Sequence, residues 1–187
     1  MKKFELTAES KINIFGKKLF RIKALISFGD VEEGETGGWI EKEENLEQSS
    51  GDAWVYGDAE VYGDAEVYGD ARVYGNARVS GDAEVYGDAR VYGNARVYGD
   101  ARVSGDAEVY GNADYTTIHG FGTQFRTTTF FQCEDKQIRV SCGCFLGTIP
   151  EFREQVKNTR EGKIAEEYLM IADLMEKHFV KEKESGE

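Results

Sequence analysis

The feature of this sequence that most constrains its fold is a six-residue repeat in its centre. Residues 51–110 are ten consecutive copies of G-[DN]-A-x-V-[YS] without insertion or deletion, and an eleventh copy decays over residues 111–116. In an extended chain the alanine and valine of each copy face one side, and the variable residue and the tyrosine face the other. The glycine and the aspartate or asparagine after it tolerate the backbone angles of a corner. Each copy therefore predicts a very short strand followed by a turn.

One copy cannot bury its apolar pair alone, so successive turns of chain must stack on one another. A three-cornered coil of 18 residues satisfies this geometry and gives about 3.5 coils over residues 51–116. The asparagines of the repeat support this period, because they recur every 18 residues, at Asn76, Asn94 and Asn112. We therefore predict a mainly β protein built around a parallel β-helix.

The repeat resembles the hexapeptide-repeat family, whose members fold as left-handed parallel β-helices. Residues 55–60 (VYGDAE) have that family's order, in which a small residue follows an aliphatic one four positions later. The sequence departs from the family pattern in the tyrosine or serine directly after the valine. The resemblance implies a left-handed coil and a homotrimer, and it is nearly silent about function.

The flanking segments resemble those of uncharacterised bacterial and bacteriophage hexapeptide-repeat proteins. The motifs are RIKAL and GGWI before the repeat, GDAWV at its start, and TTTFF, SCGCFLGT and EYLMI after it. This resemblance covers nearly the whole chain and implies a phage or prophage origin. It brings no assigned activity.

The sequence divides into three parts. Residues 1–50 predict an N-terminal β-rich cap, with a hairpin joining residues 11–15 and 18–25 through a two-residue turn, Gly16-Lys17. This hairpin is basic and residues 29–50 are acidic, so we expect the two to pair and cover the first coil; the alternative is an exposed basic docking surface. Residues 51–116 are the β-helix.

Residues 117–187 predict a C-terminal α+β domain. A hairpin joins residues 127–132 and 137–142, and Thr148 with Glu151 forms a capping box at the start of a first helix. A second helix is expected over about residues 163–181, with a frayed tail after it.

Charge excludes several functions. The chain has 23 basic and 35 acidic side chains, a net charge of −12, which disfavours direct binding to nucleic acid or to an anionic membrane. No apolar stretch approaches the ~20 residues of a membrane span. Three cysteines cannot all pair with one another, so a secreted disulfide scaffold is disfavoured. These observations favour the cytoplasm.

Two faces of the predicted helix carry the candidate sites. The tyrosine face has a net charge of −3, and we expect it to bind a partner through an unbroken aromatic ladder and two arginines, because tyrosine and arginine dominate binding hot spots: Tyr56, Tyr74, Tyr92, Tyr110, Arg72 and Arg90. The asparagine face is nearly neutral, at −1, and is the predicted oligomer interface: Asn76, Asn94, Asn112, Arg78 and Arg96. The alternative for the asparagines is simple interchange with aspartate at a corner. The third face has a net charge of −4.

Catalytic chemistry has few candidates. His119, just past the last coil, is the only plausible general base, and no activated nucleophile accompanies it. Cys133, Cys142 and Cys144 lack the spacing of a zinc site, and the aspartate columns place one ligand per coil, so neither predicts a metal. A reactive thiol remains the alternative to buried, apolar cysteines. We expect no cofactor and no metal.

These observations favour a non-catalytic, oligomeric binding protein. In a phage setting its specific form is an inhibitor of a host defence protein, with the acidic surface occupying a basic groove. The alternatives are an acyltransferase of the hexapeptide-repeat type, a structural or assembly protein of a virion, and a sponge for a small nucleotide signal.

Overall fold

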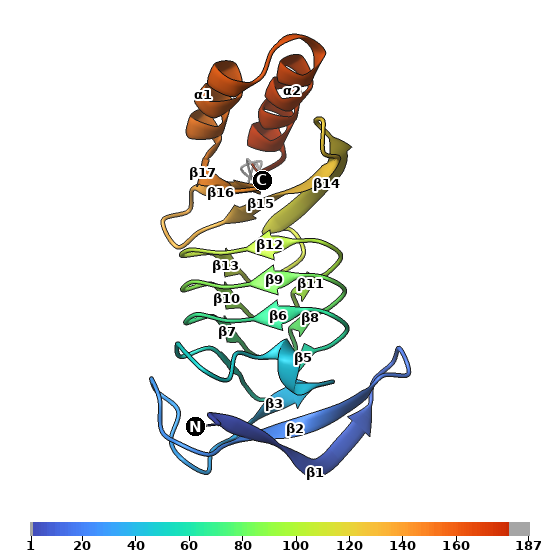
Figure 1. Ribbon diagram of the computed structural model, residues 1–187, viewed down its shortest axis with the longest axis vertical. Helices are drawn as coiled ribbons and strands as arrows, with labels where there is room; N and C mark the ends of the chain where they lie inside the picture. Colours follow the sequence, from blue (N-terminus) through green and yellow to red (C-terminus); the bar gives the residue numbers. More distant parts are fainter. Residues whose placement is uncertain (1, 180–187) are drawn as a thin grey trace, which may run out of the picture.

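The structure is a computed structural model that describes residues 2–179. It is mainly β: a parallel β-solenoid in the centre, an antiparallel hairpin below it, and a four-stranded sheet with two helices above it (Figure 1). Neither helix within residues 2–179 has the length and apolar character that a membrane span requires.

Each copy of the repeat contributes one two-residue strand. Partners in register are 18 positions apart, as in Arg90 with Arg72 and Val91 with Val73. Three parallel stacks result, with β4, β7, β10 and β13 on the tyrosine face, β5, β8 and β11 on the asparagine face, and β6, β9 and β12 on the third. The strands are β4 Trp54–Val55, β5 Glu60–Val61, β6 Glu66–Val67, β7 Arg72–Val73, β8 Arg78–Val79, β9 Glu84–Val85, β10 Arg90–Val91, β11 Arg96–Val97, β12 Arg102–Val103 and β13 Glu108–Val109.

The solenoid core consists of the alanine and valine of every copy. All of these side chains are buried, from Ala53 and Val55 in the first copy to Ala107 and Val109 in the tenth. The glycines at the corners have φ between +57° and +74° in ten copies, a region that L-residues rarely adopt. Alternation within each copy therefore places the apolar pair inside, as the sequence predicts.

The N-terminal segment extends the asparagine-face sheet. Strands β1 (Phe4–Ile12) and β2 (Lys18–Ala24) pair antiparallel, β2 pairs antiparallel with β3 (Thr36–Ile40), and β3 pairs parallel with β5. A short 3₁₀ helix, η1 (Glu43–Asn45), follows. The expected two-residue turn is wrong: Ile12 pairs with Lys18, so five residues form the loop, organised by the Asn13 side chain.

The first coil is covered by polar groups as well as by a strand. The buried Asn45 amide donates to the carbonyls of Gly63 and Ala65, at 3.0 and 2.8 Å. The buried Lys3 ammonium donates to the carbonyl of Ala53 at 3.1 Å, and burial lowers its pKa. These contacts satisfy backbone acceptors that an open solenoid end would expose.

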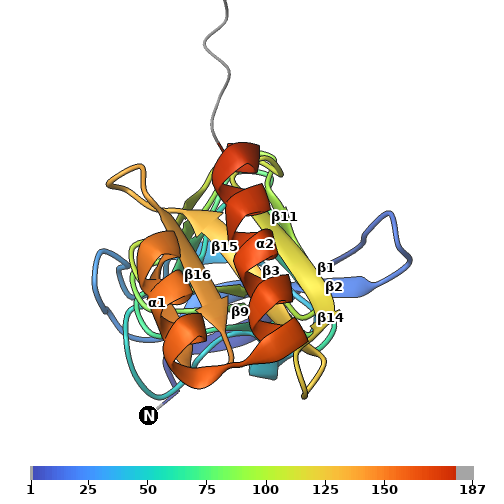
Figure 2. The same cartoon turned by 90° about the horizontal axis from the view of Figure 1, so that it is seen from above.

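The last coil is covered by a four-stranded antiparallel sheet, β14 (Tyr115–Phe121), β15 (Arg126–Gln132), β16 (Ile138–Cys142) and β17 (Phe145–Thr148). Its strands β15 and β16 form the expected hairpin, but the sheet begins at Tyr115 and contains two further strands. Helices α1 (Ile149–Thr159) and α2 (Gly162–Phe179) lie on this sheet (Figure 2). The Thr148–Glu151 capping box is present. The expected tail lies outside the described residues, as does the predicted end of the second helix.

Candidate functional site

The tyrosine face carries a short aromatic stack. The rings of Tyr74 and Tyr92 are parallel, with centroids 4.9 Å apart, because the two residues occupy equivalent positions on successive coils. The expected unbroken ladder is wrong at the Tyr56 end, and at the other end the ring contact continues without parallel stacking. Tyr110 meets Tyr92 edge-on, and the Tyr56 hydroxyl instead donates to Asp30 at 3.0 Å. The parallel stack therefore comprises two rings. The folded chain already fixes both side chains, so they lose little further conformational entropy when something binds to them.

The arginines of this face are paired with carboxylates from both caps. Arg72 lies 3.1 Å from Asp30 in the N-terminal segment, and Arg90 lies 3.6 Å from Glu108 and 3.7 Å from Glu134. A groove of about 360 Å³ on this face is lined by Asp30, Tyr56, Arg72, Tyr74 and Arg90. Burial raises the pKa values of Tyr74 and Tyr92, so both hydroxyls stay protonated and can donate hydrogen bonds.

The asparagine face is open to solvent in the single chain. Asn76, Asn94 and Asn112 are all exposed, and the Asn112 side chain accepts a hydrogen bond from the Arg96 backbone at 2.9 Å. A groove of about 570 Å³ follows this face from Phe15 to Asn112. Its other lining residues are Lys17, Tyr62, Arg78, Ser80, Arg96 and Tyr98.

A hairpin arm, residues 11–18, projects beyond the edge of the asparagine face (Figure 2). Its tip exposes Ile12 and Ile14, each 73% exposed, and Phe15, 61% exposed. The Phe15 ring lies 6.0 Å from that of Tyr62. Three exposed apolar side chains on an ordered turn are costly in water, so this tip has the character of an interaction surface.

The arm is anchored to the solenoid through a buried carboxylate that the sequence did not single out. Glu60, 6% exposed, lies 2.9 Å from the Lys11 ammonium and 3.4 Å from the Arg78 guanidinium. Lys11 also lies over the Trp39 ring, 4.6 Å from its centroid. The variable position of the repeat is at least partly exposed from Glu66 to Glu108, whereas Trp54 and Glu60 are buried where the N-terminal segment packs on the solenoid.

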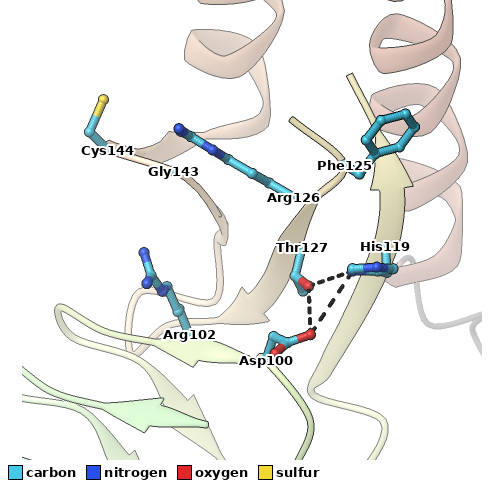
Figure 3. A pocket seen from close by; sticks show the side chains of 8 residues that line it. All are labelled: Asp100, Arg102, His119, Phe125, Arg126, Thr127, Gly143 and Cys144. Carbon is cyan, nitrogen blue, oxygen red and sulfur yellow. Dashed lines mark hydrogen bonds and ion pairs between the residues drawn. The ribbon is translucent and has the colours of Figure 1, made fainter. Parts of the chain in front are cut away.

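His119 lies in a separate pocket where the solenoid meets the C-terminal sheet (Figure 3). Its Nδ1 is 3.0 Å from the Thr127 hydroxyl, which in turn donates to Asp100 at 3.3 Å. The pocket has a volume of about 640 Å³ and is also lined by Arg102, Phe125, Arg126, Gly143 and Cys144. Because the Thr127 hydroxyl donates to Asp100, its oxygen can accept a hydrogen bond from His119 in the tautomer that carries a proton on Nδ1.

The three cysteines do not gather at one point. Cys133 is buried, and burial raises the pKa of its thiol, so it behaves as an apolar side chain. Cys142 is half-buried and accepts from the Thr128 hydroxyl, whereas Cys144 is exposed at the rim of the His119 pocket. Within residues 2–179 no cluster of three or more metal-ligating side chains occurs.

The repeat is similar to a described protein family. The model of the YdcK beta-solenoid repeat matches residues 65–81, 71–87, 83–99, 89–105 and 95–111, which extend from within the third copy to just past the end of the tenth. No curated protein matches the chain significantly. The match covers most of the repeat and neither cap, and it supports a β-solenoid repeat family for the central part of this chain.

Proposed function

We propose that this protein is a non-catalytic binding protein that engages a protein partner through its tyrosine face. The observation that carries the proposal is the parallel stack of Tyr74 and Tyr92 beside an open groove, with Arg72 and Arg90 two positions before them in β7 and β10. Aromatic and arginine side chains that are already ordered lose little freedom on binding, and they dominate the energetics of protein interfaces.

The charge of this face indicates the kind of partner. Asp30, Glu108 and Glu134 pair with the two arginines, and the tyrosine face as a whole has a net charge of −3. A partner whose basic groove normally binds the phosphates of a nucleic acid would bind these carboxylates in their place. For a chain of phage or prophage origin in a bacterial cytoplasm, a nucleic-acid-binding defence protein of the host fits this description.

Self-assembly is the second part of the proposal. A homotrimer would bury the asparagine face and its groove of about 570 Å³, together with the exposed tip of the arm, in contacts between copies. The near-neutral charge of this face favours that arrangement over the two acidic faces. A left-handed 18-residue coil of the hexapeptide-repeat type, which we propose for the solenoid, has the triangular cross-section that such a trimer requires.

Partner capture tests the tyrosine face with a built-in control. Tyr68 and Tyr86 form a second parallel stack, also 4.9 Å between centroids, on the third face. Pull-downs from a bacterial lysate with wild type, Tyr92→Ala and Tyr86→Ala therefore compare the loss of one parallel stack on each of two faces; Tyr92→Ala also removes the edge-on contact with Tyr110. The proposal predicts that wild type and Tyr86→Ala capture a partner protein in stoichiometric amount, and that Tyr92→Ala captures much less of it. Equal recovery of the partner protein by wild type and both variants contradicts the proposal.

Acyl transfer is the second candidate, and the His119 geometry favours it specifically. If Nδ1–H donates to Thr127, the other ring nitrogen, Nε2, carries the lone pair that a general base needs. The test is turnover of acyl-coenzyme A with candidate acceptors, comparing wild type with His119→Ala. Turnover that disappears in the variant would replace the binding proposal with an enzymatic one.

A further inference from the structure

The pocket between the solenoid and the C-terminal sheet is lined by two arginines and one aspartate, in a molecule whose net charge is −12. Two guanidinium groups reach one side of it, Arg102 from β12 below and Arg126 from β15 above (Figure 3). Asp100, the acidic side chain of the lining, lies on the opposite side with His119 and Thr127. The charges of the pocket are thus separated into a basic and an acidic wall.

Arg126 forms no ion pair with a carboxylate of residues 2–179, whereas most arginines of the protein do. Arg102 lies 2.9 Å from Glu84 through one nitrogen, which orients its guanidinium and leaves other donors available. A guanidinium without a carboxylate partner among residues 2–179, on the same side of the pocket as an oriented one, is suited to bind an oxyanion through two or more hydrogen bonds.

The Arg126 guanidinium also lies where a side chain at position 143 would otherwise be, and that position is a glycine. Gly143 has φ +63°, and a Cβ at this position would lie 2.5 Å from Nη1 of Arg126. Any side chain there would displace the guanidinium. The glycine therefore permits both the turn and the position of Arg126 against it.

The rim of the pocket carries a strained aromatic residue. Phe125 has φ +49°, an uncommon conformation for a bulky side chain, and it is 67% exposed. Backbone strain of this kind persists only where the surrounding structure enforces it, and it is concentrated at binding and active sites. The exposed Phe125 ring lies on the His119 side of the pocket, where it offers a flat apolar surface across from the basic wall (Figure 3).

From these observations we propose that the pocket binds a small organic anion, with its phosphate or carboxylate group between Arg102 and Arg126 and an apolar ring against Phe125. The volume of about 640 Å³ accommodates a molecule of that size. This site is separate from the tyrosine face, and the inference does not depend on the proposed function.

The test uses the full-length protein and three probes: phenyl phosphate, benzoate and inorganic phosphate. Binding is followed by shifts of the backbone amide resonances of residues 126, 127, 143 and 144, and affinity by calorimetry. Phenyl phosphate should bind with shifts confined to the pocket. Inorganic phosphate should bind more weakly because it lacks the ring. Benzoate that binds as tightly as phenyl phosphate would assign a carboxylate ligand, and benzoate without binding would assign a phosphate ligand.

Variants distinguish the site from general charge attraction. Arg126→Gln should weaken phenyl phosphate binding about tenfold or more, because it removes a charge-assisted contact. Gly143→Ala should have a similar effect while the net charge stays the same. Lys157→Gln, the same charge change on exposed α1, should have no effect. The proposal is overturned if no probe binds, or if Arg126→Gln and Lys157→Gln change binding equally.

Discussion

Stacked corner glycines allow the solenoid geometry to be tested quantitatively. Gly81 and Gly99 occupy the same corner on successive coils, with φ +73° and +66°. A Cβ on Gly81 would lie 2.9 Å from the Gly99 backbone nitrogen and 3.2 Å from its Cα, whereas a Cβ on Gly99 would meet no atom within 4 Å. The two Gly→Ala variants therefore share the cost of a left-handed backbone and differ in the contact with the next coil.

The expected magnitudes follow from these contacts. The left-handed conformation costs alanine about 1–2 kcal/mol, and the loss of glycine's freedom in the unfolded chain returns about 0.4–1 kcal/mol. Gly99→Ala should therefore lower the free energy of unfolding by about 0.5–1 kcal/mol. Gly81→Ala should lower it by about 1–3 kcal/mol more, because rigid backbone must move to accept the added carbon.

The assay is equilibrium urea unfolding of both variants and wild type, followed by far-ultraviolet circular dichroism. The midpoint should fall clearly further for Gly81→Ala than for Gly99→Ala, with similar slopes. Equal losses in the two variants would refute the stacked-corner geometry, since the backbone conformation alone would then explain both.

Three further predictions concern the coil ends and assembly. Asn45→Ala should lower the free energy of unfolding by about 2–3 kcal/mol, because it leaves two carbonyls of the first coil without their donor; thermal unfolding measures this, and no change would contradict it. Burial raises the pKa of Tyr115 to about 12, so its neutral form stabilises the fold below pH 10, and stability should fall as the pH rises from about 10 to 12. Tyr115→Phe should flatten that decline in chemical unfolding curves, and an unchanged slope would refute the assignment. In light scattering at micromolar concentration, wild type should have a mass of three 21.0 kDa chains, and both Phe15→Ser and the Asn76→Asp, Asn94→Asp double variant should lower it; a monomeric wild type would rule out the trimer.

The repeat was predictable because each copy contains its own strand and corner. Alternation of Ala and Val fixes which side chains enter the core, and the spacing of the asparagines indicates which positions stack. The caps were less predictable because their contacts are not local. Nothing near Asn45 in sequence shows that its amide will meet the carbonyls of Gly63 and Ala65.

The candidate sites likewise combine contacts that sequence spacing predicts with contacts that depend on distant segments of the chain. Stacking of Tyr74 on Tyr92 follows from their spacing, whereas the turning of Tyr56 toward Asp30 depends on the N-terminal segment. Glu60 occupies a position that is at least partly exposed in the copies after it, and contacts with the N-terminal segment accompany its burial. The His119 pocket combines residues from β12, β14, β15 and the turn at Gly143, so only the folded chain brings its two arginines together.

The most direct test of the proposed function is the affinity of the captured partner for two matched variants. Loss of a central aromatic at an interface costs about 2 kcal/mol or more, which corresponds to roughly 30-fold in the dissociation constant. Tyr92→Ala should weaken binding by about that factor, and Tyr86→Ala, which removes an equivalent stack from another face, should leave it unchanged. Equal affinity for Tyr92→Ala and wild type would contradict a binding role for the tyrosine face.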